Sequence, residues 1–500
     1  MLGIAFLILL TAVLNYSLIS RGIFTLRLKE LNIKKNLGAG KRFFLKQVFT
    51  ETTAFFFTAL VFALILIYLF SPKIQQLFEF DFNLISIQFP KIVGPFVVLV
   101  FILITITSLS LNWQLSNKIT GIVSKAKQIG LRRKNSLTLV AGFQFLISIV
   151  LISSLFVVYK QLKYALNKDL GFTKENVIFM TNSSIAQKKD VLIQEFGKIN
   201  GVRDISASFG IPGLESTRNG YLPEGEDKWQ LFNAMYVDDK FFETYDIELA
   251  EGRTFLGGKD SDKGKYVINE TLAKELNWTN PLGKSLFRND NHEIIGVVKD
   301  FHLASIYEKI PPLIISKEFS DEFYALSIKL SPQDIQGTIA GLEKTWKTIL
   351  PNEVFSFSFF DETYQRIYDR IVKLGNLLLI FTLIAISISL LGLFGVTLLL
   401  VNSYKKEIGV RKVNGAKISE ILIMLNKNFV MWVVIAFILA CPITWFTMTK
   451  WLEAFAYKID ISWWILAPAG AITLAIALLT VSLQSWKAAN RNPVEALRYE

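Results

Sequence analysis

The sequence predicts a multi-span α-helical membrane protein with about seven transmembrane helices and an inserted α+β extracytoplasmic domain. Three observations predict this class. The 500-residue chain is 52% hydrophobic and only 19% charged, which is more apolar than an ordinary soluble domain. Seven stretches without Asp, Glu, Lys or Arg are long enough to cross a bilayer core, which needs about 20 apolar residues. One long segment, 161–370, changes to a mixed polar composition with turn-forming residues.

The seven predicted spans fall into two groups, four before the polar segment and three after it. They lie near residues 2–20, 52–70, 92–112, 138–159, 374–402, 429–449 and 463–485. The single cysteine, Cys441, lies in the sixth span beside Pro442. We therefore expect Cys441 to be a packing residue, and we expect neither a disulfide framework nor a thiolate metal site.

A net charge of +12 is compatible with nucleic-acid binding, but the positions of the charges argue against it and indicate a membrane orientation. Lys and Arg are frequent in three segments and sparse in two short connections. The frequent segments are 21–46, 118–134 and 405–427, and the sparse ones are 71–91 and 450–462. The positive-inside rule makes the first set cytoplasmic and the second external. The chain is then a multi-pass protein of the inner (plasma) membrane, with 161–370 extracytoplasmic and the C-terminus cytoplasmic.

The sequence repeats itself across these spans. Lys29-Glu30, followed by Gly38-Ala39, recurs as Lys406-Glu407, followed by Gly415-Ala416, at an offset of 377 residues. A second set recurs at an offset of 373, in which Pro95, Trp113, Asn117 and Lys118 match Pro468, Trp486, Asn490 and Arg491. We therefore predict two copies of one three-helix membrane unit. The predicted domains are 1–135 and 371–500 for these units, 136–160 for a further transmembrane helix and 161–370 for the extracytoplasmic domain.

Each copy also predicts a short cytoplasmic helix of mixed charge. Glu30 precedes Lys34 by one helical turn, and Glu407 precedes Arg411 in the same way. This acid-first order is the favourable one for a pair four residues apart, and a following glycine is a natural helix terminator. A single copy is compatible with an ordinary juxtamembrane basic segment. Two copies at matching positions favour a paired docking surface for a cytoplasmic partner.

The polar segment predicts an α+β domain that folds either as one unit or as two packed lobes. Short β-rich runs alternate in it with helical runs. The β-rich runs are 177–179, 293–298 and 325–330, and the helical ones are 188–199, 270–276 and 335–350. Its two histidines, His292 and His302, lie among acidic residues, but their spacing fits no common metal-ligand motif. We expect both to be solvated loop residues.

No catalytic motif is present in the sequence. Gly38-Ala39-Gly40-Lys41 superficially resembles a phosphate-binding loop, but Lys35 stands where the motif needs glycine and Arg42 replaces its Ser or Thr. Neither a Gly-x-Ser-x-Gly elbow nor a His-Glu-x-x-His helix occurs. We therefore expect a non-catalytic subunit without cofactor or metal, with any ATPase activity in a partner chain.

Several motifs identify a family resemblance that runs nearly end to end. They are 406–416 followed by an apolar helix, the ending 486–498, and 267–270, 280–284 and 294–302 in the polar segment. These stretches closely resemble the membrane subunits of the MacB/FtsX/LolC class of ABC transporters, which are FtsX-like permeases with a MacB-like periplasmic core domain. The resemblance implies that the segment after the second helix of each half docks on a separate ATP-binding subunit.

Carried over residue by residue, the resemblance implies two sets of docking residues. The second copy supplies Lys406, Glu407, Gly409, Arg411, Lys412, Gly415 and Ala416, and the first supplies Lys29, Glu30, Lys34, Lys35, Gly38 and Ala39. Asn32 stands where the second copy has Gly409, so we expect the two docking sites to be unequal. In this class each half begins with a helix and an outward domain. We therefore expect the chain to be a truncated or shortened member that lacks the first helix and the first outward domain. The alternative is a genuine seven-helix protein.

The resemblance implies mechanotransmission, in which ATP-driven closure of cytoplasmic subunits moves the outward domain, most simply for export of a substrate. A non-transporting sensor or scaffold, which regulates a cell-wall enzyme or senses antimicrobial peptides, shares every motif. A channel or ion-coupled carrier is disfavoured because the spans contain no ionisable residue. The implied partners are two copies of the ATP-binding subunit, membrane lipid, a periplasmic adaptor, and a second copy or a second permease; nucleic acid is not among them.

Overall fold

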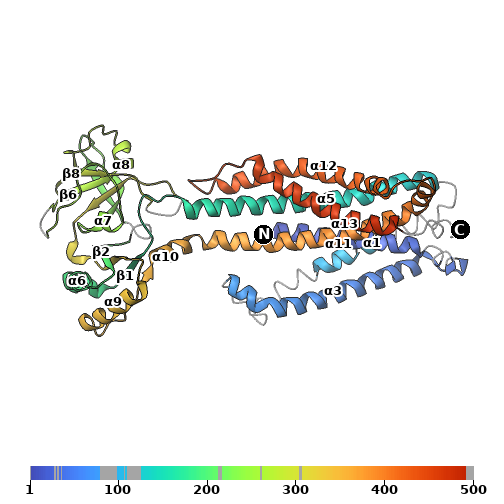
Figure 1. Cartoon of the computed structure of the whole chain (residues 1–500), viewed down its shortest axis with the longest axis horizontal. Helices are drawn as coiled ribbons and strands as arrows, with labels where there is room; N and C mark the ends of the chain where they lie inside the picture. The colour runs from blue at the N-terminus through green and yellow to red at the C-terminus, as the bar shows by residue number, and fades with distance from the viewer. Residues whose placement is uncertain are drawn as a thin grey trace. The chain divides into compact units, whose positions relative to one another are not determined.

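The structure, a computed structural model, describes residues 2–27, 30, 33–34, 36–78, 98–105, 107–109, 126–211, 217–258, 262–302 and 307–490. The chain divides into two compact units, which we call the membrane unit and the α/β unit (Figure 1). The membrane unit comprises Met1–Tyr159, Lys373–Thr449 and Asp460–Glu500, and the α/β unit comprises Lys160–Val372 and Lys450–Ile459.

Long helices build the membrane unit. They are α1 (Leu2–Leu26), α3 (Lys41–Phe78), α5 (Ala126–Asn167), α11 (Asp369–Val413), α12 (Ile418–Leu452) and α13 (Trp463–Ala489). These six are the helices long and apolar enough to cross a membrane within the described part of the chain, and they match six of the seven predicted spans. Helices form here because bilayer hydrocarbon leaves backbone groups no partner except one another. Of the remaining predicted span, 92–112, the described part is a short apolar helix, and the rest lies outside the described residues.

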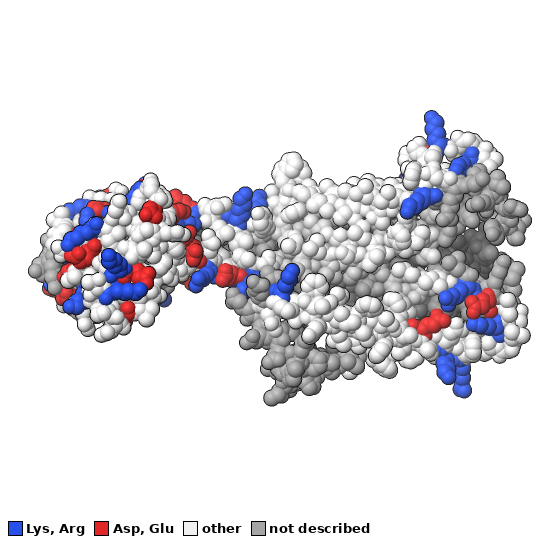
Figure 2. Space-filling view, turned by 60° about the horizontal axis from the view of Figure 1, so that its bottom comes forward, with Lys and Arg blue, Asp and Glu red and all other residues white. Residues whose placement is uncertain are grey.

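Helix α5 occupies the centre of the membrane unit. Its most apolar window is 67% buried by the rest of the chain, against 0% for that of α3. Phe145 and Ile149 of α5 pack in one cluster with Leu18 of α1 and Val396 of α11, and α12 and α13 complete this cluster. On the face in view, Figure 2 shows a broad part of the membrane unit without charged side chains, as expected for a surface in contact with lipid.

Two β-sheets form the α/β unit. The four-stranded sheet has the order β11-β1-β10-β2, and the seven-stranded sheet has the order β5-β8-β6-β9-β4-β3-β7. The strands are β1 (Val177–Thr181), β2 (Val202–Ser208), β3 (Thr217–Pro223), β4 (Gln230–Tyr236), β5 (Leu249–Gly252), β6 (Lys265–Asn269), β7 (Ser285–Phe287), β8 (Asn291–Val298), β9 (Leu313–Ser316), β10 (Ala325–Leu330) and β11 (Ser358–Phe359). Pairing is antiparallel except for β4 with β9 and β6 with β8. Both sheets share one compact unit, so the predicted α+β domain is confirmed.

Three of the five described helices of the α/β unit begin at a side-chain N-cap. The five helices are α6 (Ser183–Phe196), α7 (Phe241–Thr244), α8 (Glu270–Glu275), α9 (Ile335–Ile349) and α10 (Phe360–Ile367). Asn182, Asn269 and Asp334 accept hydrogen bonds from the first turns of α6, α8 and α9, which satisfies otherwise unpaired N–H groups. Helices α6 and α9 bury Phe196 and Trp346 in the unit's main hydrophobic core.

The connection between α12 and α13 belongs to the α/β unit, because buried Gln161 of α5 holds it there. The Gln161 Nε2 donates to the Tyr457 carbonyl at 3.0 Å, and its Oε1 accepts from the Ile459 N–H at 3.0 Å. The ring of Tyr307 stacks on Phe455 with centroids 4.6 Å apart. The Gln161 side chain therefore holds the backbone of this connection at two positions, Tyr457 and Ile459.

The expectation that the two histidines are solvated is wrong. His292 lies in β8 with 7% of its surface exposed, and His302 is 4% exposed. His292 stacks on Tyr266 with centroids 4.5 Å apart, and His302 contacts the edge of Tyr457 at 4.9 Å. Aromatic neighbours therefore pack against both buried imidazole rings.

Candidate docking segments

The second predicted docking segment is the C-terminal end of a transmembrane helix. Helix α11 continues from its span through Lys406 to Val413 without interruption, so the predicted separate short helix is wrong. Pro is absent from this stretch, and one internal glycine, Gly409, does not end the helix. The predicted pair forms at the helix surface, where Arg411 Nη2 lies 2.9 Å from Glu407 Oε1.

The segment ends in a glycine cap. Gly415 adopts φ of +86°, a left-handed conformation that glycine takes without steric cost. The Ala416 N–H then donates to the Arg411 carbonyl at 3.0 Å, five residues back, as in a Schellman motif. The end of α11 therefore has a defined geometry before α12 begins at Ile418.

The first docking segment repeats this geometry. Lys34 Nζ lies 2.7 Å from Glu30 Oε1, and this contact holds the pKa of Glu30 below its ordinary value. Gly38 adopts φ of +94°. The Ala39 N–H donates to the Lys34 carbonyl at 3.0 Å, again five residues back. Lys29 and Lys35 lie outside the described residues, as does the side chain of Lys406.

Packing divides the second segment into an inner and an outer face. Ile408 is 6% exposed and packs in one cluster with Ile421 and Leu425 of α12, and Gly409 is also buried. Lys412 Nζ donates to the Ala489 carbonyl at the end of α13, at 2.7 Å. Of the docking residues predicted in this second segment, Glu407, Arg411 and Gly415 are exposed. Gly409 is therefore enclosed within the unit and is not available for direct contact with a partner.

Exposed apolar residues accompany the ion pairs, and the sequence analysis did not single them out. Val410 and Val413 are 51% and 64% exposed, and Ile33 and Leu37 are 61% and 82% exposed. Ile33 and Val410 match at the offset of 377. Apolar side chains beside fixed charges are typical of a protein contact surface. The recurrence of an apolar residue at the equivalent positions 33 and 410 was the available sequence signal.

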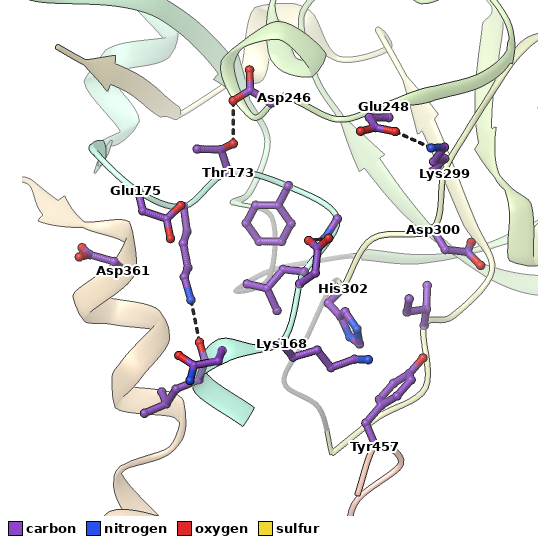
Figure 3. A pocket seen from close by; sticks show the side chains of 18 of the residues that line it. Lys168, Thr173, Glu175, Asp246, Glu248, Lys299, Asp300, His302, Asp361 and Tyr457 are labelled. Atoms are coloured by element: carbon purple, nitrogen blue, oxygen red, sulfur yellow. Dashed lines mark hydrogen bonds and ion pairs between the residues drawn. The ribbon is translucent and has the colours of Figure 1, made fainter. Parts of the chain in front are cut away.

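A polar cavity of about 1170 Å³ lies in the α/β unit (Figure 3). Its charged lining residues are largely engaged with neighbours. Lys299 pairs with Glu248, and the Thr173 hydroxyl donates to Asp246 at 2.6 Å. Lys168 lies 4.4 Å from the centre of the Tyr457 ring, beside His302. The contact of Lys168 with Tyr457 helps to hold the connection between α12 and α13 on the α/β unit.

The buried position of His302 should make the free energy of unfolding depend on pH. Burial, and to a lesser extent the charge of Lys168, lowers the pKa of His302 from 6.5 to about 4. The unfolded chain therefore binds a proton that the folded chain does not, and the free energy of unfolding should fall as the pH drops from about 6.5 to about 4. Thermal unfolding of the detergent-solubilised chain across this range measures it. His302→Gln should flatten this part of the profile, whereas identical slopes for both chains would refute the assignment.

Comparisons with known proteins match both units. The FtsX-like permease C-terminal family matches residues 2–122 and 379–493, and the MacB-like periplasmic core domain matches 138–328. The ABC transporter permease YknZ of Bacillus subtilis is 27% identical over 60% of this chain and 77% of its own length. The macrolide export ATP-binding/permease protein MacB of Aggregatibacter actinomycetemcomitans is 23% identical over 41% of this chain and 34% of its own length.

A third relative is the ABC transporter permease YvrN of Bacillus subtilis, which is 25% identical over 56% of this chain and 74% of its own length. Among solved structures, the periplasmic region of MacB from Actinobacillus actinomycetemcomitans matches 40% of this chain and 97% of its own, at 18% identity. The TM-score of this match is 0.30.

Proposed function

We propose that this chain, which belongs to the ABC transporter permeases with FtsX-like membrane units and a MacB-like periplasmic core domain, couples ATP hydrolysis by a separate subunit to movement of its periplasmic domain. In this proposal the chain is not itself an enzyme. Its two docking segments hold cytoplasmic ATP-binding subunits, and the coupled movement drives export of a substrate.

The recurrence of one capped, ion-paired segment carries this proposal. Acid–base contacts of 2.7 and 2.9 Å occur in the two copies, each followed by a glycine with φ near +90°. Surface ion pairs contribute little to stability, so stability alone gives little reason to keep the arrangement twice. A pair of equivalent ATP-binding subunits gives such a reason.

Helix α11 supplies the mechanical connection in this proposal. It runs for 45 residues without proline from Asp369, which belongs to the α/β unit, to Val413 in the second docking segment. At 1.5 Å per residue such a helix is about 65 Å long. Movement of its cytoplasmic end is therefore transmitted along a continuous hydrogen-bonded rod. We place both docking segments and the C-terminus in the cytoplasm and the α/β unit outside.

Co-purification from the native membrane tests the proposal. A tagged full-length chain should bring down an ATP-binding subunit, and the complex in lipid nanodiscs should hydrolyse ATP, whereas the isolated chain should not. Recovery of a histidine kinase or a cell-wall hydrolase in place of an ATP-binding subunit would instead support the sensor or scaffold function. Hydrolysis of ATP by the isolated chain would overturn the proposal.

A further inference from the structure

The internal repeat extends from the docking segments into the membrane, where it aligns helices α1 and α11. The offset of 377 that relates Gly38 to Gly415 also relates Asn15 to Gly392 and Ile8 to Ala385. The two ranges that match the FtsX-like family begin at residues 2 and 379, which are also 377 apart. Residues of α1 and α11 can therefore be compared position by position.

Equivalent residues of these two helices meet. Ile8 and Ala385 are 8% and 3% exposed and lie in one buried cluster. Further along, a Cβ atom added to Gly392 would collide with the amide of Asn15, its own equivalent. Contact between identical positions of two parallel elements is the signature of a twofold relation. Helices α1 and α11 thus cross at a local pseudo-twofold axis.

At this crossing α1 carries a polar side chain, Asn15, where α11 carries a glycine, Gly392. Asn15 is 7% exposed, and its Nδ2 donates to the Ile388 carbonyl at 2.8 Å. Gln144 of α5, 2% exposed, donates to the Asn15 Oδ1. Ser148 of α5 and Ser389 of α11 lie 3.1 Å apart through their hydroxyls. Polar groups in hydrocarbon need such partners, and hydrogen bonds between helices are one of the forces that hold membrane bundles together.

We propose that α1 and α11 form an internal pseudo-twofold seam, in which Asn15 is the knob and Gly392 the hole that select pairing between the two halves of one chain. Pairing of α11 with α11 of a second copy would place Gly392 against Gly392 and remove the side-chain donor that Asn15 supplies to the Ile388 carbonyl. Pairing of α1 with α1 would force two Asn15 side chains into the space of one. The asymmetry therefore disfavours both alternatives.

This seam makes one chain sufficient to present both docking segments. If the proposed function holds, one copy of the chain binds two ATP-binding subunits, and a second copy is not needed to complete the bundle. The seam itself does not depend on that function. Its failure and the failure of the proposed function are distinguishable, because the seam is tested without nucleotide or partner.

A knob-and-hole exchange tests the seam. Gly392→Asn should crowd Asn15 and reduce the yield of folded protein in the membrane by about tenfold, as expected for overpacking. Asn15→Gly combined with Gly392→Asn moves the knob to the other helix, where the carbonyl of Thr11 is the equivalent acceptor. The double variant should recover most of the yield, to within about twofold. A double variant no better than Gly392→Asn would overturn the proposal.

Cysteine cross-linking tests it without disturbing the polar contacts. A Cβ atom at Gly395 would lie 2.8 Å from Ile19 Cγ1, so Ile19→Cys with Gly395→Cys in a Cys441→Ser background should form a disulfide within one chain. The pair Ile8→Cys with Ala385→Cys repeats the test if the first pair folds poorly. Chains that carry one cysteine each, when co-expressed, should not cross-link. Disulfide-linked dimers formed between such chains would contradict an internal seam.

Discussion

A flexible Gly-Ser stretch of about six residues inserted after Asp369 should uncouple ATP hydrolysis from movement of the α/β unit. Asp369 is the first residue of α11. A Gly-Ser linker behaves as a random coil, which transmits neither rotation nor axial displacement between the segments that it joins. An environment-sensitive label on Val354→Cys, at a position that is 80% exposed, should lose its ATP-dependent change. The ATPase rate of the complex should stay within about twofold, because the docking segments are untouched.

The same insertion elsewhere in the α/β unit is the control. Gly225 adopts φ of +84° in the turn between β3 and β4, and exposed turns of this kind tolerate added residues. Insertion after Gly225 should leave the label's response to ATP unchanged. If the insertion at Asp369 also leaves the label's response to ATP unchanged, α11 does not transmit the movement to the α/β unit.

Substitution of Val413→Asp should release the ATP-binding subunit. Val413 is 64% exposed at the end of the second docking segment, so the folded chain should tolerate a carboxylate there. Burial of that carboxylate against a partner would cost several kcal/mol. Recovery of the ATP-binding subunit in co-purification should fall at least tenfold, which corresponds to about 1.4 kcal/mol of binding free energy.

Two variants make this result specific. Val354→Asp introduces the same change at an exposed position of the α/β unit and should not affect recovery. Ile33→Asp introduces a carboxylate into the first docking segment. The loss of recovered ATP-binding subunit should differ in size from that of Val413→Asp, because Asn32 stands in the first segment where the second has Gly409. Full recovery of the ATP-binding subunit with Val413→Asp would exclude this surface as the contact.

Local composition predicted six of the spans and the α+β character correctly because each depends on residues close together in the sequence. The span 429–449 has no charge for 21 residues, and the structure places it inside α12. The strand prediction 325–330 coincides with β10. The pairs Glu30 with Lys34 and Glu407 with Arg411 were predictable for the same reason, since each joins residues one helical turn apart.

Features that join distant residues were not predictable. Gln161 holds Tyr457 and Ile459, nearly 300 residues away, and no local pattern records that contact. The spans were characterised as free of ionisable groups, but neutral Asn15 and Gln144 form the polar contact between helices. His292 and His302 have polar sequence neighbours, yet strand pairing and aromatic packing bury both. The alignment of the two repeats offered a signal for Asn15, because a glycine stands opposite it.

Cross-linking from Val413 to the ATP-binding subunit tests the central claim most directly. Cys441 is the single cysteine, so Val413→Cys in a Cys441→Ser background can be labelled at one site with a photoreactive maleimide in inside-out membrane vesicles. The proposal predicts a cross-linked product that contains the chain and an ATP-binding subunit. Labelling of this cysteine by a membrane-impermeant reagent from the outside of intact cells, without any such product, would contradict it.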